Sequence, residues 1–183
     1  MTTMMTTRTM KINEQAFEAI YLSFQPQLYR YFAACFNSDD AEDLCQQLFM
    51  KLWLYQLQNP NFVPNNWRAW LFRAAVNLKN DHIRLLKCLP QTFELIENED
   101  SPADPFLLPD GCEAHVEQLA VRQALFALKD RDRDLILLKY MGFSSGEIGT
   151  MLNLSASAVR SRSVTAKEHF AKQLRKYSAV HNE

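Results

Sequence analysis

The sequence predicts an all-α protein built from two small helical domains joined by an acidic, proline-containing linker. The chain of 183 residues holds 4 glycines, and apolar residues recur at helical spacing through most of it. Residues 90–117 instead hold eight Asp or Glu, four of the seven prolines and no Lys or Arg. Prolines at that density interrupt helices and like charges repel, so we expect an extended linker over 90–115. The linker would separate a domain over 13–89 from one over 116–177, with a flexible tail over 1–12 and another tail over 178–183.

The composition is that of a globular protein, with 48% hydrophobic and 22% charged residues and a formal net charge of -1. No apolar run is long enough to span a membrane and the first residues lack the apolar segment of a signal peptide. We therefore expect a cytoplasmic protein with no direct membrane insertion. Glycine-rich phosphate loops and metal-spaced clusters are absent, which predicts no catalytic residues, no metal and no cofactor. The widely spaced cysteines are expected to be buried thiols: Cys35, Cys45, Cys88 and Cys112.

The first domain is predicted to begin with a helix that Asn13 caps. Apolar residues follow at helical spacing: Phe17, Ile20, Tyr21 and Phe24. Pro26 removes a backbone N–H donor, so we expect it to kink this helix or to restart it before residues 28–36. The next helix has capping-box spacing at Asp39 and Glu42.

The helix after Asp39 combines an apolar stripe with a polar face. Its stripe runs through Leu44, Leu48, Leu52 and Tyr55, with Phe49 and Trp53 beside it. The opposite face carries Asp43, Gln46, Gln47 and Met50. This face suits a hydrated protein interface, and it is equally typical of an ordinary solvated surface.

Residues 56–65 contain two prolines and three asparagines, which predicts a loop, and Asn66 is placed to cap a third helix from Trp67. In that helix Trp70, Leu71, Ala74, Leu78 and Ile83 are expected in the core. Other faces carry Trp67, Arg73, Asn77, Asn80 and Arg84. Aromatic rings and guanidinium groups stack on exposed bases, and amides hydrogen-bond base edges. Residues 66–89 carry five basic residues, Lys79 among them, against one acid, a charge pattern that phosphate binding or a solvated face would explain.

The second domain ends in a helix-turn-helix pattern. Amphipathic segments over 119–128 and 135–140 precede Ser144 and Glu147, which have capping-box spacing, and a long basic helix starts at Ala156. The motif needs a small residue at the helix crossing, a residue that tolerates positive φ in the turn, and an apolar anchor. Gly149, Asn153 and Val159 meet these needs at the required spacing. The last helix offers candidate major-groove and phosphate contacts: Ser157, Arg160, Ser161, Val164, Thr165 and Lys167, with Lys172 and Arg175 near its end.

Three blocks of the sequence, over 40–53, 67–84 and 145–162, occur in the order found in bacterial RNA polymerase sigma factors of the extracytoplasmic-function (ECF) group, which the chain resembles along most of its length. The resemblance implies sigma region 2 in the first domain and sigma region 4 in the second. Core RNA polymerase and promoter DNA would be the partners, region 2 taking the −10 element and region 4 the −35 element. Gly149 replaces the Ala that is usual at the helix crossing.

The resemblance also implies roles for residues. The polymerase clamp coiled coil would contact Asp43, Gln46, Gln47 and Met50. A base flipped out of the −10 duplex would lie at Asn59, Asn61 and Phe62, and the melting junction along Trp67, Arg73, Asn77, Asn80 and Arg84. The −35 element would meet Arg160, Ser161, Arg162, Val164 and Thr165. Region 4 would also contact the polymerase flap, the linker would follow the polymerase channel, and an anti-sigma factor, often membrane-bound in this group, would hold the protein inactive.

Two other function classes compete with this interpretation. A stand-alone helix-turn-helix regulator, acting without polymerase, would explain residues 144–177 and leave the blocks over 40–84 unexplained. An enzyme would need a cluster of chemically active side chains, and the histidines are isolated in the sequence: His82, His115, His169 and His181. Satisfied core or solvated surface explains each histidine better.

Overall fold

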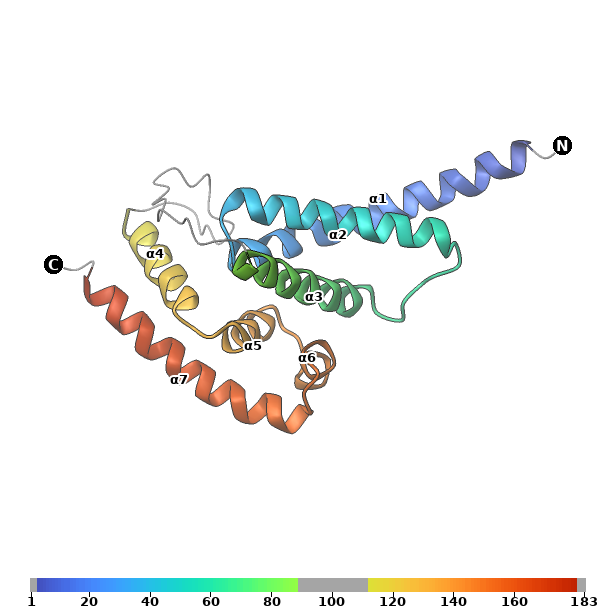
Figure 1. Cartoon of the computed structure of the whole chain (residues 1–183). Helices are drawn as coiled ribbons and strands as arrows, with labels where there is room; N and C mark the ends of the chain where they lie inside the picture. The colour runs from blue at the N-terminus through green and yellow to red at the C-terminus, as the bar shows by residue number, and fades with distance from the viewer. Residues whose placement is uncertain (1–2, 89–111, 181–183) are drawn as a thin grey trace.

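The computed structural model describes residues 3–88 and 112–180, with side chains over 14–88 and 119–178, and within them it contains helices and no strand. The first domain consists of α1 (Thr3–Ala33), α2 (Ser38–Gln58) and α3 (Trp67–Cys88). The second consists of α4 (Cys112–Phe126), α5 (Asp130–Tyr140), α6 (Ser145–Leu152) and α7 (Ala156–Val180). Figure 1 shows α3 lying between the pair α1 and α2 and the helices of the second domain. The predicted all-α, two-domain architecture is confirmed.

Several helix ends differ from the boundaries expected from the sequence. Helix α1 starts at Thr3, so it covers most of the stretch predicted as a tail over 1–12. Pro26 lies inside α1 and does not divide it, although an interior proline costs about 3 kcal/mol. Helix α1 packs on α2 before Pro26, where the ring of Phe17 lies 4.9 Å from that of Trp53, and after it, where Leu28 is wholly buried.

The remaining differences lie at other helix ends. The N-cap of α2 is Asn37, whose side chain accepts a hydrogen bond from the backbone N–H of Asp40 at 2.8 Å, and the predicted cap at Asp39 lies inside the helix. Asn66 caps α3 as predicted, its side-chain oxygen accepting from the N–H of Ala69 at 3.0 Å. Helix α4 starts at Cys112, inside the predicted linker, and α7 continues past residue 177 to Val180. The rest of the predicted linker lies outside the described residues.

Each domain has an apolar centre. In the first, Leu44, Leu48 and Leu52 of α2 are buried against α1 and α3, as their spacing predicted. Cys35 and Cys45 are buried as expected, and burial raises the pKa of the Cys35 thiol to about 12 and that of the Cys45 thiol to about 11. Cys88 was predicted to be buried and is exposed, because it is the last residue of α3.

The two domains are in direct contact through α3. It packs on α6, and the ring of Phe72 on α3 lies 5.0 Å from that of Phe143, which precedes α6. It meets α5 through Lys79 and Asp134. Among the described residues, no helix is long and apolar enough to cross a membrane.

Candidate nucleic-acid interface

Helix α3 carries four of the predicted contact residues along one line. Arg73, Asn77, Asn80 and Arg84 are spaced by four, three and four residues, which places them on one side of a helix that turns about 100° per residue. Asn80 is half-buried and the other three are exposed. We call these four residues the α3 polar stripe. The guanidinium of Arg84 donates to Asp81 at 2.7 Å in an exposed ion pair, which leaves its other donors facing solvent.

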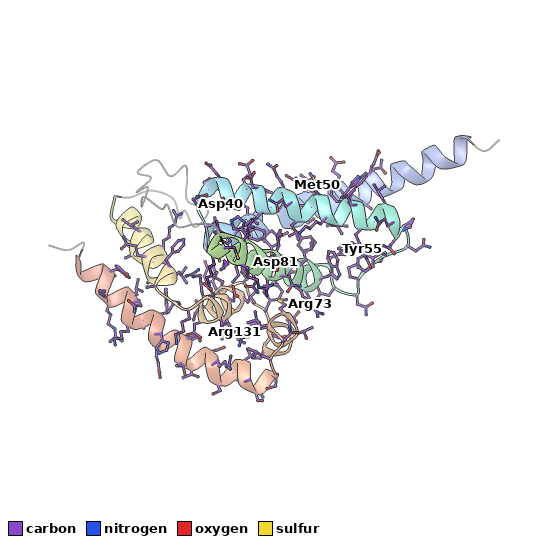
Figure 2. All side chains as sticks on the ribbon, viewed as in Figure 1. Asp40, Met50, Tyr55, Arg73, Asp81 and Arg131 are labelled. Atoms are coloured by element: carbon purple, nitrogen blue, oxygen red, sulfur yellow. The ribbon has the colours of Figure 1, made fainter. Side chains whose placement is uncertain are left out.

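A pocket of about 270 Å³ opens between α2 and α3 beside this stripe. Its apolar floor contains Leu48, Leu52 and Leu78, and its rim carries polar groups. Figure 2 labels Tyr55 near the end of α2, and Arg73 and Asp81 along α3. The full lining is Leu48, Lys51, Leu52, Tyr55, Trp70, Ala74, Asn77, Leu78 and Asp81. An apolar hollow with a few polar groups at its rim is the usual form of a small-molecule binding site.

The sequence identified only Asn77 among the residues that line this pocket as a site residue. Trp70 was assigned to the core, and it is half-buried with one face on the pocket. Lys51, Tyr55 and Asp81 were not singled out as site residues. Tyr55 belongs to the predicted apolar stripe of α2, and its position at the end of that stripe, next to the loop, is the signal that could have marked it.

Aromatic rings form one wall beside the pocket. Phe62, from the loop after α2, lies 4.8 Å from Tyr55, 5.4 Å from Trp70 and 6.2 Å from Trp67, measured between ring centroids. The structure thus brings the predicted residues Phe62 and Trp67 together with Tyr55 and Trp70. Such edge and tilted contacts hold rings in place, which preorganises their exposed faces.

The predicted loop residues Asn59 and Asn61 are exposed and do not line the pocket. The side-chain amide of Asn59 donates to the carbonyl of Tyr55 at 3.0 Å, and its backbone N–H donates to the same carbonyl. Asn59 therefore ends α2 and fixes the start of the loop.

The predicted polymerase-binding residues on α2 are all exposed: Asp43, Gln46, Gln47 and Met50, the last with 63% of its surface accessible. Figure 2 shows Met50 on the side of α2 away from α3. Gln46 donates to Glu42 at 3.3 Å, one turn earlier. An exposed methionine among polar groups makes an adaptable contact surface.

The helix-turn-helix geometry of α6 and α7 is as predicted. Asn153 ends α6 with φ 55°, in the left-handed region. The N–H of Leu154 donates to the carbonyl of Gly149 at 2.8 Å, and a Cβ atom on Gly149 would lie 2.5 Å from the Leu154 carbonyl oxygen. Val159 is wholly buried. These contacts fix the angle at which α7 leaves the turn.

The start of α6 is fixed by a complete capping box. The N–H of Ser144 donates to Glu147 at 2.9 Å, and the N–H of Glu147 donates to the Ser144 hydroxyl at 3.3 Å. Hydrogen bonds from Ser144 lower the pKa of the Glu147 carboxyl below its ordinary value. The carboxylate is therefore ionised at neutral pH and stabilises the positive end of the helix.

Helix α7 buries one side and exposes the other. Val159, Ser163 and Ala166 are buried against the rest of the domain. All the predicted −35 residues are exposed: Ser157, Arg160, Ser161, Arg162, Val164, Thr165 and Lys167. At about 100° per residue, Ser161 lies near the middle of the exposed side, with Arg160 and Arg162 on its two flanks. Such a surface can enter a major groove and touch the phosphates on both sides.

One basic residue of α3 is not available for phosphate contact in this structure. Lys79, counted above with the positive charge of residues 66–89, is wholly buried, and its ammonium lies 2.6 Å from Asp134 of the second domain. Arg133 is also buried, and its guanidinium donates to the carbonyls of Leu125, Phe126 and Leu128 at the end of α4. In the described part of the chain no three His, Cys, Asp or Glu side chains are grouped to hold a metal ion.

Comparisons with known proteins match both domains. The family described as Sigma-70 region 2 matches residues 20–87, and that described as Sigma-70, region 4 matches residues 118–170. The ECF RNA polymerase sigma factor SigW of Bacillus subtilis is 28% identical over 174 residues, which cover 90% of this chain and 92% of SigW.

Solved structures share the fold. The sigma factor RpoE in complex with the anti-sigma factor NepR from Bartonella quintana aligns with a TM-score of 0.64 and 20% identity, over 88% of this chain and 98% of that one. CnrH in complex with the cytosolic domain of CnrY aligns with a TM-score of 0.61 and 24% identity, over 93% of this chain and 94% of that one. The region 2 match precedes the region 4 match along the chain, and together they span most of the described residues. The alignment with SigW covers most of both chains. The chain belongs to the sigma-70 family of RNA polymerase sigma factors, in the extracytoplasmic-function group.

Proposed function

We propose that this protein binds core RNA polymerase and directs promoter-specific transcription initiation, with the first domain on the −10 element and the second on the −35 element. The observation that carries the proposal is the pocket between α2 and α3, with its aromatic wall and the α3 polar stripe, in the same chain as a complete helix-turn-helix. A stand-alone regulator needs only the helix-turn-helix.

The first domain has the groups needed to capture an unpaired base. Unstacking a base costs a few kcal/mol, and stacking it on an aromatic side chain returns about 1–3 kcal/mol. Tyr55 and Trp70 offer ring faces in the pocket, and Asn77 at the rim offers an amide for a base edge. Arg73 and Arg84 on the polar stripe would hold the phosphates on either side. Capture of the base shifts the duplex toward the melted state without any chemical step.

The second domain would read duplex DNA. Arg is the usual partner of guanine O6 and N7, and Ser or Thr hydroxyls adapt to several base edges. Arg160, Ser161 and Thr165 on the exposed side of α7 supply both kinds of group.

The polymerase contacts would lie on other surfaces. Asp43, Gln46, Gln47 and Met50 on α2 would meet the clamp coiled coil, and the second domain would also touch the flap. The acidic linker, proposed to follow the polymerase channel, lies outside the described residues except for its last part in α4.

An anti-sigma factor is a further proposed partner, possibly a membrane-bound one, that would hold the protein inactive in the cytoplasm. The support is the likeness to the RpoE and CnrH folds, each solved in a complex, with NepR and with the cytosolic domain of CnrY respectively.

The test is a reconstituted run-off transcription assay with bacterial core polymerase on DNA that includes the upstream region of this protein's own gene. Specific transcripts that require the protein would support the proposal. A footprint on DNA without polymerase, with no transcripts, would favour the stand-alone regulator.

A pair of variants tests base capture in the same assay. Tyr55→Leu keeps an apolar side chain at the pocket but removes a stacking face, so we expect fewer transcripts from duplex promoters. A template already unpaired over the −10 element should restore much of the yield, because the unstacking cost is then absent. Tyr140→Leu, at an exposed tyrosine in the second domain, is the matched control and should leave the yield unchanged.

A further inference from the structure

A different side of helix α3 from the polar stripe meets the second domain. Arg68, Phe72 and Lys79 recur on one side of the helix and meet the second domain. The Arg68 guanidinium lies 4.2 Å from the centre of the Phe143 ring and donates to the carbonyl of Met141. The region 2 helix that we propose to bind the melted strand is thus also the helix that holds region 4.

The centre of this interface is a buried ion pair. The Lys79 ammonium donates to both carboxylate oxygens of Asp134, at 2.6 and 2.7 Å, and the Tyr31 hydroxyl donates to the same carboxylate at 2.9 Å. Lys79 and Tyr31 are wholly buried and Asp134 is 2% exposed. Tyr31 comes from α1, Lys79 from α3 and Asp134 from α5, so the three groups span both domains.

Such a pair specifies an arrangement more than it stabilises one. Removing two charges from water costs about as much as their attraction returns, whereas removing one partner leaves a buried charge that is strongly destabilising. Burial raises the pKa of Asp134, whereas the attraction of Lys79 and the hydrogen bonds from Lys79 and Tyr31 lower it. Separation of the domains would return both charges to water, so the charges themselves add little to the free energy of opening. A closed state in which only one of the two charges is present would be strongly destabilised.

The closed arrangement is too compact for two-site promoter binding. Elements centred at −10 and −35 are about 25 base pairs apart, which is about 85 Å of B-form DNA at 3.4 Å per base pair. Helix α3 packs on α6 and α6 packs on α7, and packed helices lie about 8–10 Å apart. The axes of α3 and α7 therefore approach each other to about 20 Å or less, so one domain must move away before both elements can be read.

We propose that Lys79, Asp134 and Tyr31 form a latch that holds the two domains in a closed, inhibited state which must open for promoter binding. The inhibitory role rests on the proposed function, whereas the existence of the latch does not. No other protein is needed to form it, because all three groups belong to this chain.

The existence of the latch is tested on the full chain alone, by small-angle X-ray scattering and hydrogen exchange. Asp134→Ala leaves Lys79 buried without its carboxylate, so we expect the closed-to-open ratio to fall at least about a hundredfold, with a larger radius of gyration and faster exchange in α5. Lys79→Met, altered in the other domain, should open the chain in the same way. Asp132→Ala, which removes a carboxylate from the same helix whose partner is His169 in the second domain, should leave the dimensions unchanged.

A double variant separates the charge from the contact. Lys79→Gln combined with Asp134→Asn replaces the ion pair by two neutral amides and keeps a side-chain oxygen as acceptor for the Tyr31 hydroxyl, so the chain should stay closed. The latch proposal would be refuted if both single variants kept the radius of gyration and the hydrogen-exchange rates of the natural sequence, with native helix content by circular dichroism. Loss of helix content in one single variant leaves the other to decide, because the two substitutions lie in different domains.

The run-off transcription assay then tests whether the closed state is inhibited. At limiting protein, the single variants should yield more run-off transcript than the natural sequence, and the closed double variant should yield at least about tenfold less than the single variants, since opening is required. Opening seen by scattering with no change in transcript yield would refute the inhibitory role. Absence of transcripts from every form, including the natural sequence, would instead count against the proposed function, and scattering would still decide whether the latch exists.

Discussion

Two opposing effects on stability decide whether alanine could replace Gly149. Alanine is the better helix former by about 1 kcal/mol. Here a Cβ atom would lie 2.5 Å from the backbone carbonyl oxygen of Leu154, and a backbone atom in a tight turn cannot move aside as a side-chain end can. The clash therefore outweighs the gain in helix propensity.

We predict that Gly149→Ala lowers the free energy of unfolding by about 1–3 kcal/mol, the usual cost of overpacking. Gly146→Ala is the matched control in the same helix, because its Cβ would meet no atom closer than 4.0 Å. It should raise stability by up to about 1 kcal/mol. Urea denaturation of the two variants measures both, and equal stabilisation by both would show that the turn relaxes.

Arg160 lies on the exposed side of α7 that we propose to enter the major groove. We predict that Arg160→Ala weakens binding to the −35 element by about 1–3 kcal/mol relative to scrambled DNA, without loss of polymerase affinity. Binding of the reconstituted holoenzyme to the two DNAs measures the difference. Arg175→Ala, near the end of the same helix, removes a proposed phosphate contact, so it should weaken binding to the −35 DNA and to the scrambled DNA equally. Reduced polymerase affinity in the Arg160 variant would contradict the assignment.

At the scale of helices, most elements followed from local signals, and the failures have physical causes. Apolar spacing identified α2 and α3, and the caps at Asn66 and Ser144 were placed correctly because each uses a side chain next to its own helix. Whether α1 restarts at Pro26 was left open by the sequence, and the helix continues through it because packing against α2 decides the outcome. The cap at Asn37 was missed because Asp39 offers the same chemistry two residues later.

The capping box of α6 gives its domain a predictable acid response. Two hydrogen bonds from Ser144 lower the pKa of Glu147 from the ordinary 4.5. Because the folded-state pKa is below the unfolded one, the contribution is complete above a pH of about 4.5 and is lost as the pH falls through the folded-state value. We expect the stability difference between the natural sequence and Glu147→Ala to shrink between about pH 5 and pH 3, measured by urea denaturation. A difference that stays constant with pH would show that the carboxylate charge is not involved.

At the scale of the whole molecule, the chain presents separate faces for separate partners. The α3 polar stripe and the exposed side of α7 are candidates for DNA, and the polar face of α2 is the candidate for polymerase. Sequence periodicity could predict these faces, since each lies within one helix. It could not predict the pocket, which needs two helices, or the burial of Lys79, which needs a carboxylate 55 residues further along the chain.

The face of α2 yields a prediction about assembly. Asp43→Ala combined with Gln46→Ala removes two exposed polar groups, so we expect weaker binding to core polymerase with little change in folding stability. Affinity capture on immobilised core polymerase measures the first, and thermal denaturation the second. Glu18→Ala, an exposed carboxylate on α1, controls for the change of charge. An unchanged affinity would move the polymerase contact to another face.

The aromatic wall beside the pocket has an optical consequence. Of the 3 tryptophans in the chain, Trp67 and Trp70 belong to the cluster around Phe62, and Trp53 packs on Phe17 in α1. Stacked bases quench indole emission, so the intrinsic fluorescence of the natural protein should dim when an unpaired −10 strand enters the pocket. Promoter melting can then be followed in real time without an attached dye, and the dimming should be absent with fully paired DNA that lacks the −10 element.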